Sequence, residues 1–441
     1  NISEILFMEQ KMSFFVVLII APILALKEVS QPNIVFILAD DQGYADIEPF
    51  SVYPGMNSHY KLITPNLVKM ASEGIKLTDA YCGAPVCAPS RCALMTGLHS
   101  GHCSVRENGQ YLQLNDTTVA NVLKDNGYDT AMFGKWGLGQ ENKTTISAFK
   151  NDPISKGFDT YIGQVSQENC HNYYPYLQWK QQTQYYNDTM NNMDASMNNC
   201  GEPDYDKCTW VGDLWTQYSI DYIKNPARQN KPFYLFVSYT TPHSGSVGNN
   251  NEVDVPVPRV SKGPYWQFNG TWPKPEMDYA QATTQIDTFV GEIFDALKEA
   301  NLDDNTVVFY ASDNGANNEG GANYKFFASS GYLSGYKRSL KEGGHRTGTL
   351  VRWPGKIKPG SVSDYQFTFY DFMATAADIA GINLNTLPTN DGISMLPTLL
   401  GQTQSQKEWV YHEYCQPNEQ KNGWGQAVRM GNYTGLCIGN D

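Results

Sequence analysis

The sequence predicts an α/β protein with a large, mainly parallel β-sheet flanked by helices. Two observations predict this class. Apolar segments with the composition of buried strands alternate with segments of helical periodicity, as in chains that build parallel sheets. The first strand candidate, residues 33–39, is the continuous apolar run NIVFILA, which is typical of a strand covered on both faces. A chain of 441 residues is long enough for such a core and for a smaller second domain.

The other elements follow in chain order. Further apolar segments predict strands at residues 128–133, 232–239 and 306–311. Helical periodicity predicts helices at residues 65–72, 90–96, 117–125, 279–299 and 372–380. A glycine follows three of these helical segments, as expected of helix C-caps: Gly74, Gly127 and Gly381.

Two regions depart from this alternation. Residues 140–230 are rich in Asn, Gln and Tyr, and we predict a loop-rich insertion near the mouth of the site. Residues 385–400 have the character of a linker, after which strands are predicted at 409–414 and 425–431. We therefore predict a large α/β domain over residues 31–384 and the start of a small C-terminal antiparallel-sheet subdomain over residues 385–441.

The N-terminal segment, residues 1–30, contains an apolar run at 14–26 that predicts a signal peptide, with an uncleaved anchor as the alternative. Eight of the nine cysteines remain when Cys87 is set aside, and this even number suits disulfide bonds in an oxidising compartment. A local Cys200–Cys208 bond is expected. Asn-x-Ser/Thr triplets agree with a secreted or lysosomal glycoprotein, and they begin at Asn115, Asn142, Asn187, Asn269 and Asn432.

The net charge restricts the partners. It is −13, with 17% charged and 41% hydrophobic residues, and no basic stripe is present that would bind nucleic acid. We expect neither a nucleic acid nor a stable membrane partner. An acidic protein that binds an anion needs local positive charge from Lys, Arg or a metal ion.

Polar side chains gather where the predicted strands end. Asp40 and Asp41 follow the first strand, Lys135 the second, His243 the third, and Asp313 with Asn314 the fourth. The carboxyl ends of parallel strands meet at one edge of a sheet, where ligands bind. Hard oxygen ligands favour Ca²⁺, with Mg²⁺ as the alternative. For each acidic pair alone, an ordinary turn is an equal interpretation, since Asn314-Gly315 is a common turn dipeptide.

The run Cys87-Ala88-Pro89-Ser90-Arg91, followed by Leu94-Met95-Thr96-Gly97, resembles the signature of the formylglycine-dependent sulfatases, which have an alkaline-phosphatase-like fold. In that family the cysteine is oxidised to an aldehyde, whose hydrate attacks the sulfur of a sulfate ester. The resemblance implies that role for Cys87, together with a place among the metal ligands. Half of a disulfide bond is the alternative for Cys87. Pro89 and Ser90 place Cys87 at a helix N-terminus, which attracts anions. Arg91 can donate to the aldehyde hydrate or a carboxylate ligand, or form an ordinary helix salt bridge.

Two further segments resemble the same family. Gly134-Lys135-Trp136-Gly137-Leu138-Gly139 is similar to its Gly-Lys-Trp-His-Leu-Gly motif, which implies that Lys135 binds sulfate and that Gly137 replaces a histidine. His171 and His102 are possible substitutes, but neither is assigned a role. The segment before Glu342-Gly343-Gly344 implies that Lys337 is a second sulfate lysine, with Lys341 as the alternative. His243 is similar to the histidine that binds or protonates the ester oxygen.

The resemblance runs from about residue 33 to residue 431. It implies a hydrolase of aryl or carbohydrate sulfates, with Cys87 converted to formylglycine by a generating enzyme, and a divalent cation. The alternatives are a phosphohydrolase of the same fold and a binder of sulfated glycans without activity. Segments 391–397 and 427–431 resemble late landmarks of the family. Since members usually continue further, we expect a chain truncated at its C-terminus.

Overall fold

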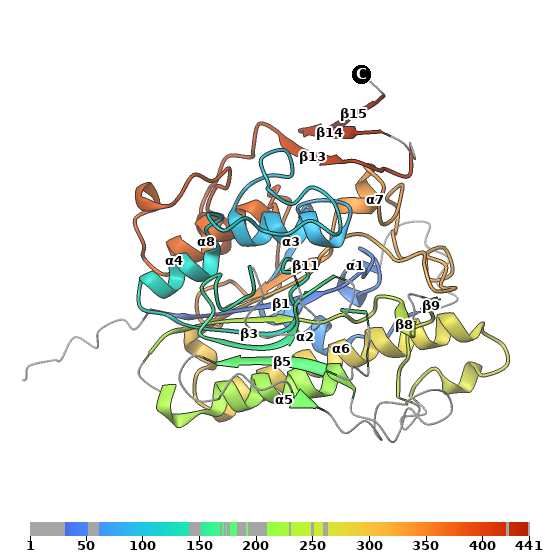
Figure 1. Ribbon diagram of the computed structural model, residues 1–441, viewed down its shortest axis with the longest axis horizontal. Coiled ribbons are helices and arrows are strands. Elements are labelled where there is room, and N and C mark those ends of the chain that lie inside the picture. Colours follow the sequence, from blue (N-terminus) through green and yellow to red (C-terminus); the bar gives the residue numbers. More distant parts are fainter. Residues whose placement is uncertain are drawn as a thin grey trace, which may run out of the picture. The chain divides into compact units, whose positions relative to one another are not determined.

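The central feature of the computed structural model is a ten-stranded sheet between two layers of helices (Figure 1). The structure describes residues 31–51, 61–140, 151–167, 170, 171, 173, 177–182, 191–192, 210–228, 231–247, 251–258, 263–419 and 423–439. Among these residues, no helix is long and apolar enough to cross a membrane. The predicted signal peptide lies outside them. Residues Gln31–Asp441 form one compact unit, while the predicted boundary at residues 384/385 stays a prediction.

The strand order of the large sheet is β12-β2-β11-β10-β1-β7-β3-β4-β5-β6. Its middle is parallel: β1 pairs with β10 and β7, β7 with β3, and β3 with β4. Ala39 pairs with Ser312, and Leu38 with Ser238, so these strands end at one edge. The strands are β1 Asn33–Ala39, β2 Ile75–Leu77, β3 Asp129–Lys135, β4 Thr160–Gln164, β5 Leu177–Gln182, β6 Asn191–Asn192, β7 Phe233–Ser238, β10 Thr306–Ser312, β11 Thr349–Arg352 and β12 Ser361–Ser363.

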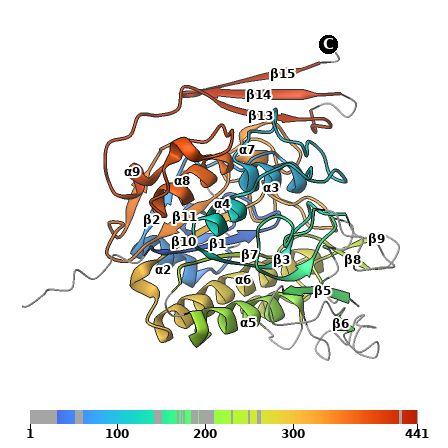
Figure 2. The ribbon, with the colours of Figure 1, turned by 60° about the vertical axis from the view of Figure 1, so that its left-hand side comes forward.

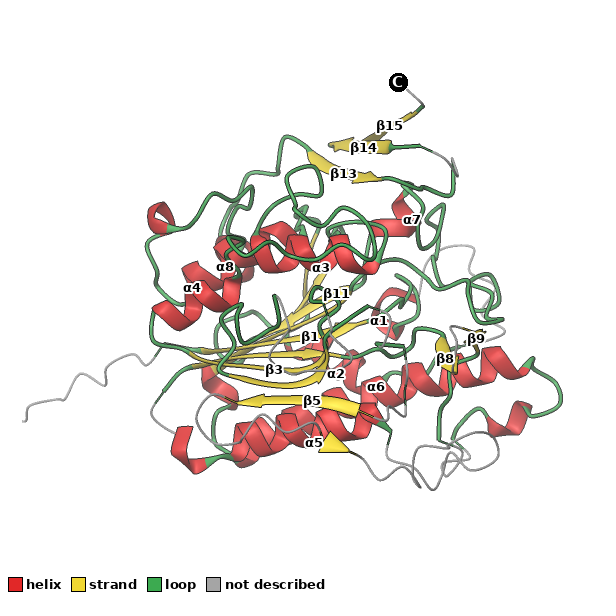
Figure 3. Ribbon diagram, viewed as in Figure 1, coloured by secondary structure: helices red, strands yellow, loops and turns green. Residues whose placement is uncertain are grey.

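The two helical layers cover opposite faces of this sheet (Figures 1 and 3). Successive side chains of a strand point to opposite faces, and β1 is buried on both. Phe36 therefore packs in the core beneath α3, α4 and α8, whereas Val35 and Ile37 pack against α2, α5 and α6. Figure 2 shows α5 and α6 side by side below the sheet. The helices are α1 Glu48–Ser51, α2 Pro65–Glu73, α3 Cys87–Thr96, α4 Val119–Asp125, α5 Val211–Lys224, α6 Lys274–Glu299, α7 Glu342–His345, α8 Phe372–Ile379 and α9 Leu396–Leu399.

A second, antiparallel sheet of β13 (Val410–Tyr414), β14 (Gly425–Met430) and β15 (Tyr433–Ile438) lies on the α3 side (Figure 1). It contacts the site-bearing part of the chain through a small apolar cluster. Val86, directly before α3, and Leu340 pack there with Tyr414 and Ala427. A short hairpin of β8 (Gly245–Val247) and β9 (Asn251–Val253) follows β7.

The α/β class, the six predicted strands and the five predicted helices are confirmed, with boundary shifts at most of the elements. The largest shift is in α6, which begins at Lys274 because Pro275 is accepted in the first turn of a helix. The expectation of a loop-rich insertion at residues 140–230 is wrong in part. That segment supplies β4, a parallel strand of the large sheet, and the 14-residue helix α5.

Glycines end the helices as predicted, for two different reasons. Gly127 and Gly381 have φ of 92° and 73°, a left-handed conformation that favours glycine. Gly74 is extended. There, a Cβ would lie 2.1 Å from the backbone oxygen of Val351, so the close approach of β11 requires glycine.

The expectation of a disulfide framework is not met among the described cysteines. No disulfide bond joins Cys82, Cys87, Cys92, Cys103, Cys170, Cys415 or Cys437. The first five are buried, and several donate to nearby carbonyl oxygens, as Cys103 Sγ does to Leu98 at 3.1 Å. The predicted Cys200–Cys208 bond lies outside the described residues.

Replacing Phe36 by alanine should destabilise the protein by about 3–5 kcal/mol. Phe36 is fully buried, and its ring packs against Phe309 at 5.8 Å and Phe372 at 4.7 Å between centroids. Alanine would leave a cavity in the middle of the sheet. Urea denaturation measures the change. Leu114→Ala is the control, because Leu114 is 81% exposed; an equal loss in both variants would contradict this account of the core.

Candidate active site

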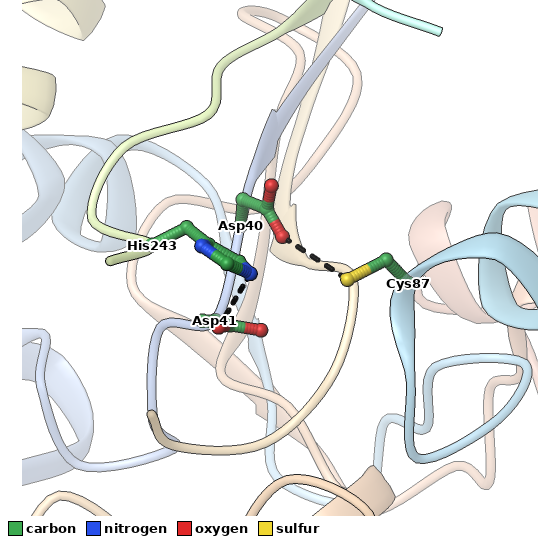
Figure 4. Close-up of side chains that lie close together, drawn as sticks. All are labelled: Asp40, Asp41, Cys87 and His243. Carbon is green, nitrogen blue, oxygen red and sulfur yellow. Dashed lines mark hydrogen bonds and ion pairs between the residues drawn. The ribbon is translucent and has the colours of Figure 1, made fainter. Parts of the chain in front are cut away.

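The candidate site lies at the edge where the central parallel strands end. Asp40 and Asp41 directly follow β1, and Asp313 directly follows β10. Lys135 is the last residue of β3, and His243 comes shortly after β7. Figure 4 shows Asp40, Asp41, Cys87 and His243 close together. Hence the structure brings together side chains from four strand ends and from α3.

Cys87 is the first residue of α3 and is fully buried. Its Sγ lies 3.5 Å from Asp40 Oδ1. Burial raises the pKa of the thiol well above its usual value; Lys135 and Lys337 lower it, while the carboxylates of Asp40 and Asp313 raise it further. Since the thiolate is the nucleophilic form of cysteine, the unmodified side chain is poorly suited to attack an ester.

The N-terminus of α3 offers fewer free donors than we expected. Ala88 N donates to Asn108 Oδ1 at 3.1 Å, Ser90 N donates to the Val86 carbonyl at 3.2 Å, and Pro89 has no N–H. The helix therefore acts on the site through the positive end of its dipole and by positioning Cys87. It does not offer a set of backbone N–H groups without acceptors.

Arg91 is buried and connects α3 to the strand ends. Its Nε donates to Asp313 Oδ2 at 2.9 Å, and its Nη1 donates to the Lys135 carbonyl at 3.0 Å. Its Nη2 forms an ion pair with the same Asp313 oxygen at 2.8 Å. Burial alone would lower the pKa of Arg91, but Asp313 and Asp40 raise it overall. Arg91 thus pairs with a predicted metal ligand across the fold, not with a neighbour on its own helix.

Two buried lysines flank Cys87. Lys135 Nζ lies 2.5 Å from Asp40 Oδ2, and Lys337 Nζ lies 2.7 Å from Asp41 Oδ2. Burial would lower the pKa of each lysine, but the adjacent carboxylates raise both. Both therefore carry a positive charge. Lys341, the alternative to Lys337, is exposed.

His243 is oriented by its neighbours. Its Nδ1 donates to the Ser244 carbonyl at 2.6 Å, because a carbonyl oxygen can only accept. The Nε2 atom then faces Lys337 Nζ at 3.0 Å and Asp41 Oδ2 at 3.3 Å. The ring therefore presents one nitrogen to the site while the other is held by the backbone.

The acidic side chains fit a hard divalent cation. Asp41, whose φ of 64° is uncommon outside glycine, accepts from Asn314 Nδ2 at 2.7 Å. Asn314 Oδ1 is buried without a hydrogen-bond partner, which leaves an oxygen ligand for an ion. Burial and the neighbouring Asp40 raise the pKa of Asp313, as expected of crowded carboxylates. Oxygen atoms from Asp40, Asp41, Asp313 and Asn314 would hold Ca²⁺ or Mg²⁺, and residue 87 adjoins them.

The charges of the buried cluster balance. Asp40, Asp41 and Asp313 are matched by the positive charges of Lys135, Lys337 and Arg91, which pair with them. A divalent cation added to this set leaves an excess of positive charge, which attracts an anion. The arrangement can therefore bind an anionic ester next to residue 87.

Sequence reasoning missed Glu319. Its Oε2 lies 2.6 Å from Lys337 Nζ, and its Oε1 accepts from Arg338. Glu319 lies in the long loop after β10 and belongs to no recognisable motif, so only the contacts reveal it. Burial alone would raise the pKa of Glu319, but Lys337, His243 and Arg338 lower it to about 2.

Glu319→Gln should reduce the acid sensitivity of the fold. The pKa of Glu319 is about 2 in the folded protein, against an ordinary value of 4.5. The ionised carboxylate therefore stabilises the folded state fully at pH values above 4.5. That stabilisation is lost as the pH falls from 4.5 towards 2. Melting temperatures at about pH 6 and about pH 3 should differ less in this variant than in the wild type. The exposed Glu408→Gln is the control; an unchanged acid-induced drop for Glu319→Gln would contradict the assignment.

The two histidines considered as substitutes at position 137 lie in different places. His171 stacks on His243, with centroids 3.8 Å apart, and its Nε2 lies 3.2 Å from Lys135 Nζ. His102 lies outside the site, where it stacks on His99 and its Nδ1 lies 3.0 Å from Asp391. Only His171 belongs to the candidate site.

The mainly parallel sheet, with a cluster of charged side chains at its carboxyl edge, defines an alkaline-phosphatase-like protein. A family model described as Sulfatase matches residues 32–382, and the chain therefore belongs to the sulfatase family. A second model, N-sulphoglucosamine sulphohydrolase, C-terminal, matches residues 332–438. Both matches agree with the order of the motifs along the chain.

Curated relatives and a solved structure agree with this family. The chain is 28% identical to N-acetylgalactosamine-6-sulfatase of Mus musculus over 397 residues, which is 84% of this chain and 66% of that protein. The chain is 28% identical to arylsulfatase G of Rattus norvegicus over 441 residues, 92% and 76% of the two chains. The crystal structure of Ps i-CgsB in complex with k-i-k-neocarrahexaose superposes with a TM-score of 0.68 at 26% identity, and covers 93% of this chain and 84% of that one.

Proposed function

We propose that this protein is a sulfuric ester hydrolase that cleaves aryl or carbohydrate sulfate monoesters, with residue 87 converted to formylglycine. The observation that carries the proposal is the position of Cys87, which starts α3 beside Asp40 in a cluster that also holds two buried lysines, Lys135 and Lys337. The named relatives are sulfatases, and one structural relative was solved with a neocarrahexaose. A carbohydrate sulfate is therefore the favoured substrate class.

In the first half of the reaction, one hydroxyl of the hydrated aldehyde at position 87 attacks sulfur. The attacking hydroxyl gives its proton to solvent, and the bond between sulfur and the ester oxygen breaks. The alcohol leaves with a proton from Nε2 of the doubly protonated His243 ring, because in the neutral ring the proton is on Nδ1. Lys135 and Lys337 stabilise charge on the other sulfate oxygens. The nucleophilic route divides one difficult step into two easier ones.

In the second half, the remaining hydroxyl of residue 87 loses its proton. The bond between its carbon and the sulfate oxygen breaks, inorganic sulfate leaves, and the aldehyde re-forms. A cysteine or serine side chain cannot take this path because it has no second hydroxyl. This requirement explains why the poorly ionised thiol of Cys87 would be replaced by an aldehyde.

We propose Ca²⁺ as the resident ion, with Mg²⁺ as the alternative, held by Asp40, Asp41, Asp313 and Asn314. A bound divalent cation supplies Lewis-acid polarisation of the sulfate oxygens. Arg91 holds Asp313 in place, and the predicted role of Arg91 at the aldehyde hydrate remains part of the proposal. Maturation would require a formylglycine-generating enzyme in the secretory pathway, consistent with a secreted or lysosomal protein.

The test determines the chemical form of residue 87 and the hydrolytic activity of the same protein sample. The full chain is produced with a formylglycine-generating enzyme, and the tryptic peptide 77–91 is weighed while sulfate release from an aryl sulfate is measured. An aldehyde mass together with sulfate release supports the proposal. A thiol mass in active protein contradicts it. Preferred cleavage of a phosphate ester would favour a phosphohydrolase, and tight binding without turnover by the aldehyde form would favour a sulfated-glycan binder.

A further inference from the structure

Gly137 leaves an open position beside the sulfate lysine. It follows β3 with φ of 72°. A Cβ built on Gly137 would lie 3.6 Å from Lys135 Cε and 3.7 Å from Arg91 Cδ, so a side chain at this position would enter the candidate site. The same Cβ would lie only 2.8 Å from Gln167 Oε1. The amide of Gln167 therefore occupies the space that a side chain at position 137 would need.

The amide of Gln167 is buried and unpaired. Gln167 is 9% exposed, and neither its Nε2 nor its Oε1 has a hydrogen-bond partner among the described residues. A buried donor without a partner destabilises the folded protein, so native proteins rarely keep one without a use. The amide oxygen Oε1 is the atom that faces Gly137, and a half-turn of the side-chain amide would put Nε2 in its place. An oxygen-rich anion beside Lys135 would then accept from Nε2 and remove that cost.

His171 approaches the same place from the loop that follows β4. The side chain is partly exposed, whereas Lys135 and His243 are buried. Because the ammonium group of Lys135 can only donate, Nε2 of His171 accepts and the proton of the neutral ring is on Nδ1. Among the described residues, no hydrogen-bond partner is found for this Nδ1–H. Hence the loop offers two unused donors, one from Gln167 and one from His171.

We propose that Gln167 and His171 are substrate-contacting residues that complete the sulfate site on the side that Gly137 leaves open. Gln167 Nε2 and His171 Nδ1 donate to oxygens of the bound sulfate ester, and His171 also holds Lys135 and supports the ring of His243. This inference rests on the proposed function, which it deepens. In this arrangement, two residues of the loop after β4 supply the contacts that the side chain absent from Gly137 would otherwise make.

The experiment measures sulfate binding separately from turnover. Inorganic sulfate is titrated into the calcium-loaded, aldehyde-containing protein by calorimetry, and its inhibition of aryl sulfate hydrolysis is measured in parallel. Gln167→Met and His171→Phe keep the approximate size of each side chain and remove its donor. Each should weaken sulfate binding by about tenfold or more, as expected for one lost hydrogen bond to an anion. His171→Gln should recover part of the affinity, because its amide can both accept and donate.

A second variant keeps the test valid if packing is disturbed. Gln167→Glu retains the shape of the side chain but turns a negative charge towards the sulfate, and it should weaken binding more than Gln167→Met. His102→Phe, the matched histidine variant outside the site, should bind as the wild type does. Sulfate affinity within twofold of the wild type in Gln167→Met, Gln167→Glu and His171→Phe overturns the inference. A wild type that binds sulfate but cleaves no sulfate ester contradicts only the proposed function, because the calorimetric comparison still decides the roles of both residues.

Discussion

Replacing Cys87 by alanine should lower the rate of aryl sulfate hydrolysis by at least ~10³-fold, since the variant has no nucleophile at the centre of the site. Binding of inorganic sulfate should persist, because Lys135 and Lys337 come from other elements and remain in place. The fold should also persist, because only the buried sulfur atom is removed, at a cost of about 1 kcal/mol. Steady-state kinetics, sulfate titration and thermal melting measure the three expectations.

Cys92→Ala is the matched control for this experiment. Cys92 lies on the same helix and is fully buried, but its sulfur contacts Ser104 and no site residue at hydrogen-bonding distance. The control variant should keep its activity with a similar change in melting temperature. Equal losses in both variants would assign the effect of Cys87 to packing in α3, and retained turnover in Cys87→Ala would remove residue 87 from the mechanism.

The parts of the site that were predictable from sequence lie on regular elements. Asp40 and Asp313 could be placed together because each follows a continuous apolar strand, and parallel strands end at one edge. Lys135 follows from the same rule. The helix that carries Cys87 could be predicted from Pro89 and Ser90, although it begins at Cys87 itself. For these residues, the local sequence pattern and the topology of a parallel sheet are together sufficient to predict their place in the site.

The remaining parts depend on contacts between loops, which leave no periodic pattern in the sequence. Glu319 approaches Lys337 from an irregular segment, and Gln167 lies against Gly137 although 30 positions separate them in the printed sequence. The segment that carries Gln167 resembled an insertion because it is rich in Asn, Gln and Tyr, yet it includes β4 of the large sheet. Composition predicted a loop where tertiary pairing with β3 imposes a strand.

Removing the divalent cation should abolish sulfate ester hydrolysis and lower the melting temperature, and Asp313→Asn should abolish the response to Ca²⁺. Three buried carboxylates lie close together at this edge. Burial would raise the pKa of Asp40, but the nearby cations lower it, whereas burial and the neighbouring Asp40 raise the pKa of Asp313. An ion present at a hundred times its dissociation constant stabilises the folded state by about 2.7 kcal/mol. Chelator-treated protein should therefore melt at a lower temperature and recover when Ca²⁺ is restored.

A second cluster in the described part of the chain could also attract a metal ion, and it is formed by His99, His102 and Asp391. The experiment must therefore show at which of the two clusters the ion binds. In that cluster His99 Nδ1 accepts from Gly101 N at 3.1 Å, so the proton of the neutral ring is on Nε2, the atom that would have to bind the ion. Asp391→Asn should accordingly keep the full Ca²⁺-induced rise in melting temperature, whereas Asp313→Asn should lose it. The reverse result would place the ion away from residue 87, and Lys135, Lys337 and Arg91 would then have to stabilise the sulfate oxygens during cleavage without it.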